Sequence, residues 1–335
     1  TRVAAVIEEM TAEGLAHPTP FEIETAVAFL FFVEEKCDPV ILEVGMGGIT
    51  DATNLIRTTE LAVLVPISMD HQSFLGNTMA EIAEKKAGII KPGCSVATIG
   101  QEPEALKVIE NVSHEAGTDL CAADISQAEV LEADFTGQRF LYKGEEYTLS
   151  LAGSYQTENA VLALEALRIL DERGYHTTTE QRREGLKATH WNGRLTIIHR
   201  DPLFIVDGAH NPGGIAAFIQ AAGKIQERTG KKPWLLFAAV SDKEYETMAK
   251  ELCEGLDWCG IGVVHMNSDR GLSAERLSQV FKKYASCDVV SFEDTKTAIS
   301  QMKQTAGGDI LFCAGSLYLI GELKVHLEEE RSKIH

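Results

Sequence analysis

The distribution of apolar and polar positions along the chain predicts an α/β protein. In the second half, short apolar runs alternate with longer segments of mixed polarity. Runs of this length are typical of buried strands, and the segments between them are long enough for helices. A regular βα alternation favours a doubly wound, mostly parallel sheet. The predicted strands are Leu203–Val206, Trp234–Ala238, Gly260–His265, Asp288–Phe292 and Asp309–Cys313.

The first half carries less regular signals. Residues 1–15 have the pattern of an amphipathic helix, and Thr19-Pro20-Phe21-Glu22 predicts a capping box that opens a helix to about Lys36. Residues 135–151 alternate in polarity around Lys143-Gly144, which predicts antiparallel strands joined by a tight turn. Further strands are predicted at Val40–Val44, Leu61–Ile67 and Ser95–Ile99, and further helices at Thr78–Ala87 and Asn159–Arg173.

The length of 335 residues suggests two domains of roughly 150 residues each. We predict that residues 187–194, which contain Trp191-Asn192-Gly193, link a domain at 1–186 to a domain at 195–335. Asp and Glu together number 50 and Lys and Arg 31, so the formal net charge is -19. This balance argues against nucleic acid or an anionic membrane as the main partner, whereas a few placed cations or metal ions can still hold a small anion.

The seven cysteines form no C-x-x-C pair, so neither a zinc knuckle nor a thioredoxin-type motif is indicated. Scattered thiols of this kind fit a reducing cytosol, and we expect a cytoplasmic protein. No apolar run reaches the ~18 residues that a membrane-spanning helix needs.

Ionisable residues follow two of the predicted strands in the first half. Glu43 precedes the turn Gly45-Met46-Gly47-Gly48, and Asp70-His71 follows the strand at 61–67. A carboxylate and an imidazole on neighbouring strand ends can bind a divalent metal. Alternatively, Glu43 caps a helix and His71 is a loop residue. The glycines either let a ligand approach the backbone or serve a tight turn for steric reasons alone.

The turn from Asp207 to Gly214 places an acid, an imidazole and an amide within five residues, at a strand-to-helix junction. The following helix N-terminus attracts anions, but the same residues also fit an Asx-type turn with a helix cap. Lys86, near the predicted end of a helix, is typical of a residue that complements the helix dipole.

Taken together, the motifs resemble the folylpolyglutamate synthase/dihydrofolate synthase family, a branch of the Mur ligase superfamily. The resemblance covers essentially the whole chain, and the motifs occur in the family's order. They are Leu42-Glu43-Val44-Gly45-Met46-Gly47-Gly48, Thr50-Asp51-Ala52-Thr53-Asn54, Met69-Asp70-His71-Gln72, Phe74-Leu75-Gly76, Glu84-Lys85-Lys86-Ala87-Gly88, Gly153-Ser154-Tyr155-Gln156 with Asn159-Ala160, Trp191-Asn192-Gly193-Arg194, Asp207-Gly208-Ala209-His210-Asn211-Pro212 and Gly315-Ser316-Leu317-Tyr318.

The resemblance implies an ATP-dependent amide ligase. ATP phosphorylates the carboxylate of a folate or of dihydropteroate, and L-glutamate attacks the acyl phosphate. The implied fold is a Mur-ligase-type central domain, with a mostly parallel sheet and a small antiparallel subsheet, followed by a Rossmann-like C-terminal domain. The family also implies a monomer, with small molecules as its partners.

The resemblance assigns roles residue by residue. Glu43 and His71 match ligands of Mg²⁺, with K⁺ as a further candidate cation. Lys86 matches a carbamylated lysine at the metal site, and His210 matches a residue near the transferred phosphate or the incoming glutamate. Asn159, Arg194 and Asp207 match ATP contacts, and Ser316 matches a contact of the glutamate carboxylate. Thr19, Phe21, Thr50, Asp51 and Ala52 match the pterin or pteroate pocket.

Two departures from the family pattern affect these expectations. The chain has no P-loop of the G-x-x-G-K-[ST] kind and no Ser-Pro-His-Leu segment, and it starts at Thr1. We therefore expect a fragment that is inactive without the loop, or a non-catalytic paralogue that lost ATP binding. Ile49-Thr50 also stands where many members have Arg-Leu, which affects a local substrate contact. Another Mur-type amide ligase, such as a cell-wall precursor enzyme, is a third hypothesis.

Overall fold

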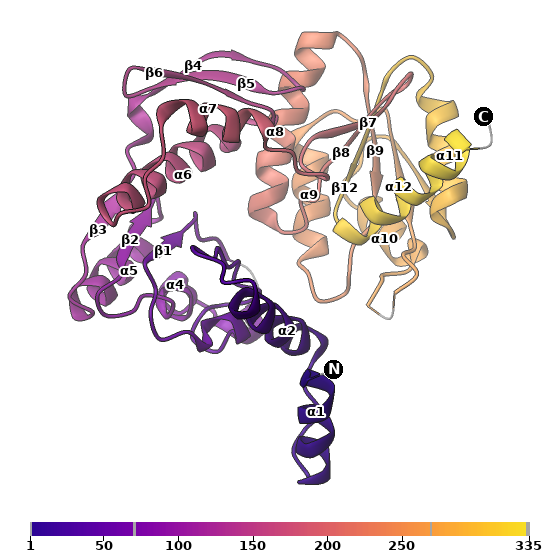
Figure 1. Cartoon of the computed structure of the whole chain (residues 1–335). Helices are drawn as coiled ribbons and strands as arrows, with labels where there is room; N and C mark the ends of the chain where they lie inside the picture. Colours follow the sequence, from indigo (N-terminus) through magenta and orange to yellow (C-terminus); the bar gives the residue numbers. More distant parts are fainter. Residues whose placement is uncertain (1, 70–71, 269, 333–335) are drawn as a thin grey trace. The chain divides into compact units, whose positions relative to one another are not determined.

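A computed structural model describes residues 2–69, 72–268 and 270–332. The chain forms two compact units, Thr1–Ala122 and Ala123–His335 (Figure 1). The predicted α/β fold class is confirmed. The predicted linker at 187–194 lies inside the second unit, and the domain boundaries at 186 and 195 stay a prediction. Within the described ranges, no helix is long and apolar enough to cross a membrane.

The first unit is built on a parallel sheet with the strand order β1-β2-β3. Its core packs Ile82 and Ala83 of one helix and Ile109 of another against Val96 of the central strand. The strands are β1 (Leu61–Leu64), β2 (Ser95–Thr98) and β3 (Leu120–Ala122), and the helices are α1 (Arg2–Ala12), α2 (Pro20–Glu34), η1 (Ala52–Leu55), α3 (Gln72–Leu75), α4 (Met79–Ala87) and α5 (Pro103–Glu115).

The start of α2 confirms a local prediction. The Glu22 amide donates to the Thr19 hydroxyl at 3.3 Å, and the Thr19 amide donates to the Glu22 carboxylate at 2.7 Å, which completes the predicted capping box. The predicted strand at Val40–Val44 is wrong, because these residues form no strand and Ile41 is 92% exposed. An apolar run becomes a strand only when a neighbouring strand supplies its hydrogen bonds.

The second unit begins with a small antiparallel sheet in the order β4-β5-β6. Lys143 and Gly144 both have positive φ angles, 50° and 83°, as a tight hairpin turn requires. This confirms the predicted antiparallel hairpin. The elements are η2 (Ile125–Gln127), β4 (Ala128–Ala133), β5 (Gln138–Tyr142), β6 (Glu145–Leu149), α6 (Ser154–Glu172) and α7 (Thr179–Ala188).

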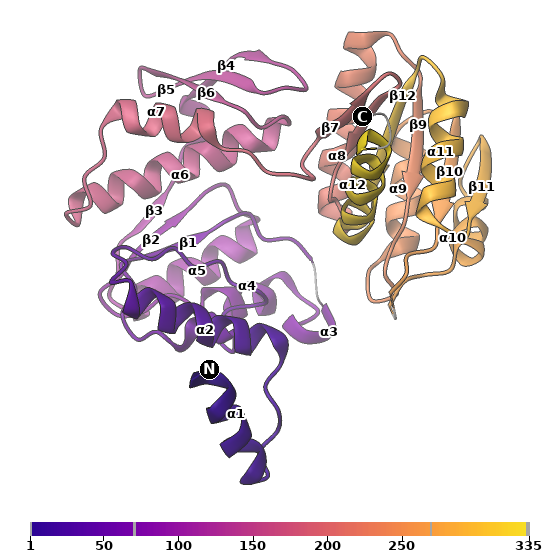
Figure 2. The same ribbon diagram turned by 45° about the vertical axis from the view of Figure 1, so that its right-hand side comes forward.

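A six-stranded sheet follows in the order β11-β10-β9-β12-β8-β7 (Figure 2). Its strands are parallel except for β7, which pairs antiparallel with β8 at one edge. The five strands predicted in this half are confirmed to within a few residues. The elements are β7 (Thr196–Arg200), β8 (Leu203–Val206), α8 (Pro212–Thr229), β9 (Pro233–Phe237), α9 (Tyr245–Gly255), β10 (Gly260–Val264), α10 (Ala274–Phe281), β11 (Asp288–Phe292), α11 (Thr295–Ala306), β12 (Ile310–Ala314) and α12 (Leu317–Ser332).

Helices cover both faces of this sheet, so its inner strands are apolar at every position. In β8, Leu203 and Ile205 join the core beneath α8, α9 and α10, whereas Phe204 and Val206 join the core beneath α11 and α12. Strand β12 lies between β9 and β8, so the turns that follow these parallel strands leave from one edge of the sheet. Ligands of open α/β sheets bind at such an edge.

Candidate active site

Three turns that are far apart in the sequence meet at the carboxyl ends of β8 and β12. The Gly208 amide donates to the Gly193 carbonyl at 2.7 Å, and the Gly315 amide donates to the Ala209 carbonyl at 2.8 Å. These bonds join residues 191–195, residues 207–212 and residues 315–318 in one backbone assembly. The structure therefore brings together three of the motifs on which the family resemblance rests.

Glycines at this junction leave room for neighbouring groups. A Cβ atom at position 208 would lie 2.4 Å from Leu317 Cδ2 and 2.6 Å from Arg194 Nη1. At position 315, where φ is 104°, a Cβ would lie 2.1 Å from the Ala238 carbonyl oxygen. Both positions need glycine for steric reasons, and the bare backbone at 208 is the surface against which the Arg194 guanidinium rests.

Asp207 is the buried centre of the junction, with 4% of its surface exposed. Its carboxylate accepts hydrogen bonds from the Leu195 amide at 2.9 Å, the Ala209 amide at 2.8 Å and the Tyr155 hydroxyl at 3.4 Å. Burial raises the pKa of Asp207, although these hydrogen bonds and the nearby Arg194 charge act in the opposite direction. The Asx-type alternative from the sequence is confirmed, because Asp207 accepts from the amide two residues ahead.

The start of α6 is tied to the junction through Tyr155, a residue of the Gly153-Ser154-Tyr155-Gln156 motif for which no role was predicted. Burial, followed by the charge of Asp207, raises the pKa of the Tyr155 hydroxyl. The buried Gln138 fixes the turn before α6, donating to the Gly153 carbonyl at 2.6 Å and accepting from Thr157 at 2.7 Å. Asn159, one turn further along α6, is exposed and donates to Gln156 at 3.1 Å.

His210 lies on the same turn, with Nδ1 2.8 Å from the Gly208 carbonyl oxygen. A carbonyl can only accept, so Nδ1 carries the proton and Nε2 of the neutral ring is an acceptor. Asn211 caps α8 by accepting from the Gly214 amide at 2.8 Å, which confirms the helix cap that the sequence left as an alternative. This arrangement places an imidazole acceptor beside the N-terminus of a long helix.

Ser316 is buried, with 4% of its surface exposed, and its hydroxyl accepts from the Tyr318 amide at 3.2 Å. It therefore begins the first turn of α12. The Tyr318 amide uses one lone pair of the serine oxygen. The serine hydroxyl proton can therefore rotate toward a further acceptor.

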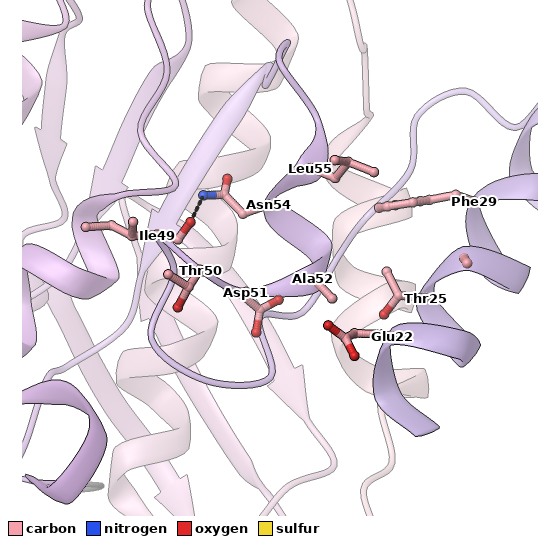
Figure 3. Close-up of a pocket in the computed structure, with 10 residues that line it drawn as sticks. Glu22, Thr25, Phe29, Ile49, Thr50, Asp51, Ala52, Asn54 and Leu55 are labelled. Atoms are coloured by element: carbon pink, nitrogen blue, oxygen red, sulfur yellow. Dashed lines mark hydrogen bonds between the residues drawn. The ribbon is translucent and has the colours of Figure 1, made fainter. Parts of the chain in front are cut away.

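The first unit holds a pocket of about 410 Å³ between α2 and the segment around η1 (Figure 3). The predicted substrate residues Thr50, Asp51 and Ala52 line it, whereas Thr19 and Phe21 do not. The other lining residues had no predicted role in a pocket, and Glu22 was predicted only as part of the capping box of α2. The lining residues are Glu22, Thr25, Ala26, Phe29, Ile49, Thr50, Asp51, Ala52, Asn54 and Leu55.

Asp51 organises the glycine-rich turn beside this pocket. It accepts from the Met46 amide at 2.8 Å and from the amide and hydroxyl of Thr53 at 2.9 and 2.5 Å. Partial burial raises the pKa of Asp51, but hydrogen bonds from Thr53, Met46 and Gly45 outweigh burial, so its pKa lies below the ordinary value. The carboxylate is thus kept ionised and held in the turn.

The glycine-rich turn lies against the last turn of α4, which carries Lys86. The Ile49 amide donates to the Lys85 carbonyl at 3.0 Å. A Cβ at Gly48 would lie 2.6 Å from that oxygen and 2.8 Å from the Lys86 carbonyl oxygen. Lys86 is half-buried at this contact. The structure therefore places the backbone of Lys86, the lysine that the resemblance expects to be carbamylated, beside the turn that follows Glu43.

The predicted metal ligands are described only in part. Glu43 is exposed just before the glycine-rich turn, whereas Asp70 and His71 lie outside the described residues. Within the described ranges, no three His, Cys, Asp or Glu side chains gather into a metal-binding group. The Glu43–His71 pair stays a prediction.

Comparison with known proteins identifies the family to which the chain belongs. Residues 2–167 match the Mur ligase middle domain, and residues 193–317 match the Mur ligase glutamate ligase domain. The chain is 32% identical over 339 residues to the dihydrofolate synthase/folylpolyglutamate synthase of Bacillus subtilis, covering 96% of this chain and 75% of that protein. It is 35% identical over 242 residues to the folylpolyglutamate synthase of Lacticaseibacillus casei, covering 70% of this chain and 55% of that protein.

Solved structures agree with this assignment. The folylpolyglutamate synthase of Mycobacterium tuberculosis complexed with ADP and AMPPCP superimposes with a TM-score of 0.83 at 27% identity, covering 97% of this chain and 76% of that one. A folylpolyglutamate synthase in complex with AMPPCP and folate gives a TM-score of 0.77 at 26% identity, covering 96% of this chain and 74% of that one.

The fold is that of a Mur ligase, with both the middle domain and the glutamate ligase domain matched. Within that superfamily, the chain belongs to the folylpolyglutamate synthase/dihydrofolate synthase family of ATP-dependent ligases. The resemblance seen in the sequence motifs is confirmed. The chain spans three quarters of the B. subtilis relative and about half of the L. casei relative.

Proposed function

We propose that the complete product of this gene adds L-glutamate to the carboxylate of a folate or of dihydropteroate, using ATP. ATP transfers its terminal phosphoryl group to the carboxylate, the amine of glutamate attacks the acyl phosphate, and inorganic phosphate leaves. Family membership supports this proposal, as do the ADP, AMPPCP and folate complexes of the related structures.

The observation that carries the proposal is the convergence of Arg194, His210 and Ser316 on one edge of a parallel sheet. The Arg194 guanidinium lies against Gly208 and keeps its positive charge at any physiological pH. It is suited to the phosphates of ATP, and Asp207 serves chiefly to hold the turns that carry Arg194 and His210. Asn159 is exposed at the start of α6, where it can contact the nucleotide.

His210 and Ser316 are suited to the incoming glutamate. An ammonium group must lose a proton before its nitrogen can attack an acyl phosphate, and Nε2 of His210 is the acceptor end of the ring. The buried Ser316 hydroxyl begins the first turn of α12 and can donate to a carboxylate oxygen.

The pocket beside α2 is suited to the pterin end of the substrate. Thr50, Asp51 and Ala52 line one side of it, and the aromatic ring of Phe29 lines another (Figure 3). Phe21 packs close to Gly45, since a Cβ there would lie 2.7 Å from the ring. Thr19 and Phe21 would then shape the pocket by positioning α2 and the glycine-rich turn.

The exposed Glu43 carboxylate, just before the glycine-rich turn, is a ligand of the kind that Mg²⁺ prefers. Glu43 and His71 would hold the ion, and Lys86, when carbamylated, would contribute an acidic group next to the same turn. Bound Mg²⁺ supplies positive charge against the phosphates. K⁺ is a further candidate cation. The proposal includes a cytoplasmic location, which the seven free cysteines support. It also includes a monomer, which rests on the family resemblance alone.

The test uses the complete gene product with ATP, Mg²⁺, L-glutamate and either dihydropteroate or a reduced folate. We expect phosphate release and a product heavier by one glutamate residue, both dependent on all components. Arg194→Ala should raise the KM for ATP, whereas Arg139→Ala, on the exposed β4–β6 sheet, should leave it unchanged. The pterin substrate that supports turnover would identify the acceptor.

The two other hypotheses predict different results. A non-catalytic paralogue would bind folate or glutamate without releasing phosphate. A cell-wall precursor ligase would release phosphate only with a peptidoglycan precursor in place of folate. Either outcome would contradict the proposed function.

A further inference from the structure

An arginine outside the junction described above is held at the carboxyl edge of the same sheet. Arg270 Nη1 donates to Asp242 at 3.3 Å, and Nη2 donates to the Tyr318 hydroxyl oxygen at 3.3 Å. Asp242 follows β9, and Tyr318 lies in the first turn of α12, directly after β12. Since β9 and β12 are adjacent parallel strands, the guanidinium lies at the same edge as the Ser316 turn.

The backbone that carries Arg270 is fixed alongside the extension of β9. The Ser241 amide donates to the Arg270 carbonyl at 2.8 Å, and the Leu272 amide donates to the Ala239 carbonyl at 3.0 Å. An isolated antiparallel bridge between Val240 and Gly271 completes this pairing. The guanidinium therefore projects from a braced segment, which reduces the entropy lost when it binds a ligand.

The pair formed by Arg270 and Tyr318 presents hydrogen-bond donors to solvent. A guanidinium has five N–H donors, and the contacts with Asp242 and Tyr318 use two of them. The Tyr318 oxygen accepts from Arg270, so its own hydroxyl proton can be donated to a ligand. The Arg270 side chain is 55% exposed and Tyr318 is 57% exposed, so both are accessible to a ligand.

The charge of the whole chain makes such a cation significant. Glutamate carries two carboxylates, and the net charge of -19 repels it at long range. A guanidinium binds a carboxylate with two parallel hydrogen bonds, which makes it a selective local attractor. The Tyr318 amide bonds to Ser316, so this guanidinium contacts the same helical turn that is proposed to hold glutamate.

We infer that Arg270, assisted by the Tyr318 hydroxyl, binds one carboxylate of the incoming amino acid and selects glutamate over neutral amino acids. This inference rests on the proposed ligase function and adds two residues to it. Asp242, which accepts from Nη1, orients the guanidinium.

A second arginine provides a matched control. Arg276 donates to the Tyr245 hydroxyl at 3.5 Å and to Glu246 at 3.3 Å, so it has the same kinds of partner as Arg270. Both of these partners belong to α9, and neither lies on the α12 turn. Loss of Arg276 therefore removes an equivalent surface contact without touching the proposed carboxylate site.

The experiment compares Arg270→Ala, Arg270→Lys, Tyr318→Phe and Arg276→Ala in the complete gene product, with folate and ATP saturating. We expect Arg270→Ala to raise the KM for glutamate by about tenfold to hundredfold, because it removes a charge-assisted pair. Arg270→Lys and Tyr318→Phe should raise the KM for glutamate by less, and Arg276→Ala should leave it unchanged. The KM for ATP should stay unchanged in all four variants. If Arg270→Ala fails to fold, the lysine variant and Tyr318→Phe still test the site.

The amino-acid preference gives a second readout. L-glutamine lacks the side-chain carboxylate, and the α-amide of glutamate lacks the other one. Loss of Arg270 should reduce the preference for glutamate over one of these two amides. The carboxylate that is missing from that amide is the one that Arg270 binds. An unchanged preference over both would overturn the inference.

A third measurement separates this inference from the proposed function. Hydroxylamine traps an acyl phosphate as a hydroxamate when ATP and folate are present without glutamate. No hydroxamate from the wild-type enzyme would contradict the proposed function itself. Hydroxamate formation by the wild-type enzyme would support the proposed function. If Arg270→Ala then has the same KM for glutamate as the control Arg276→Ala, only the inference about Arg270 is wrong.

Discussion

The Leu195 amide donates a 2.9 Å hydrogen bond to the buried carboxylate of Asp207, which joins the segment before β7 to the turn after β8. Leu195 is 2% exposed and has a φ angle of 44°, which is unfavourable for a leucine. The carboxylate therefore holds a strained residue in place, directly after Arg194. This contact sets the position of the proposed nucleotide-binding arginine.

We expect Asp207→Ala to destabilise the second unit by about 2–5 kcal/mol, because two buried amides lose their acceptor. Asp207→Asn should cost less, since its carbonyl oxygen can still accept from one amide. Urea unfolding followed by tryptophan fluorescence would measure both. Asp288→Ala, at an exposed position of β11, is the control and should change the free energy of unfolding by less than about 0.5 kcal/mol. Equal stability of all three variants would contradict this role of Asp207.

The close packing at Gly208 predicts a specific effect on nucleotide binding. Gly208→Ala would place a methyl group 2.6 Å from Arg194 Nη1 and 2.4 Å from Leu317 Cδ2, so the guanidinium must move. We expect the KM for ATP to rise by about tenfold, as for a displaced charge-assisted contact.

Gly223→Ala is the matched control for that substitution. It lies within α8, where the nearest atom to an added Cβ is Leu256 Cδ1 at 3.9 Å. We expect an unchanged KM for ATP and a helix more stable by about 0.5–1 kcal/mol. An unchanged ATP KM in Gly208→Ala as well would show that Arg194 does not contact the nucleotide.

Asp51 predicts a pH dependence for the first unit. Its pKa in the folded protein lies below the ordinary value of 3.8, so its hydrogen bonds add stability above that pH. The added stability is lost as the pH falls from 3.8 through the folded pKa. Asp51→Asn keeps only part of this bonding and does not titrate.

Hydrogen exchange of residues 45–54 would measure the effect of Asp51. We expect the difference in protection between wild type and Asp51→Asn to be largest near neutral pH and to shrink as the pH is lowered through the range below 3.8. A difference that grows on acidification would contradict the assignment.

The proposed metal ligands predict a dependence on Mg²⁺ concentration. Glu43→Ala and His71→Ala should each raise the Mg²⁺ needed for half-maximal turnover by at least about tenfold, since each removes a ligand. Glu104→Ala, an exposed carboxylate in the first turn of α5, should leave it unchanged. Turnover of either ligand variant with wild-type Mg²⁺ dependence would remove that residue from the metal site.

Local chemistry explains what could be predicted from the sequence. The capping box of Thr19 and Glu22 and the turn at Lys143-Gly144 involve residues that are neighbours in the chain, so their signals are complete within a few positions. The strands of the second half are buried on both faces and are therefore apolar throughout. Their existence could be recognised without knowing their order.

Predictions that depend on distant residues were less successful. The run Val40–Val44 has the composition of a strand but not a strand's hydrogen bonds, because pairing is a property of two segments. Gln138 and Tyr155 were missed as supports of the site for a related reason. Nothing in their neighbourhood along the chain indicates that one would hold the turn before α6 and the other would reach Asp207.

Residues that are close together along the chain specify the local elements and the α/β class, and the order of the motifs identifies the family. What those motifs do together depends on how the chain packs in three dimensions. Placing β12 between β9 and β8 brings the turns around Arg194, Asp207 and Ser316 to one edge, and it places Arg270 beside Tyr318. Local signals extend over a few residues, whereas strand order follows from burying both faces of the sheet at once.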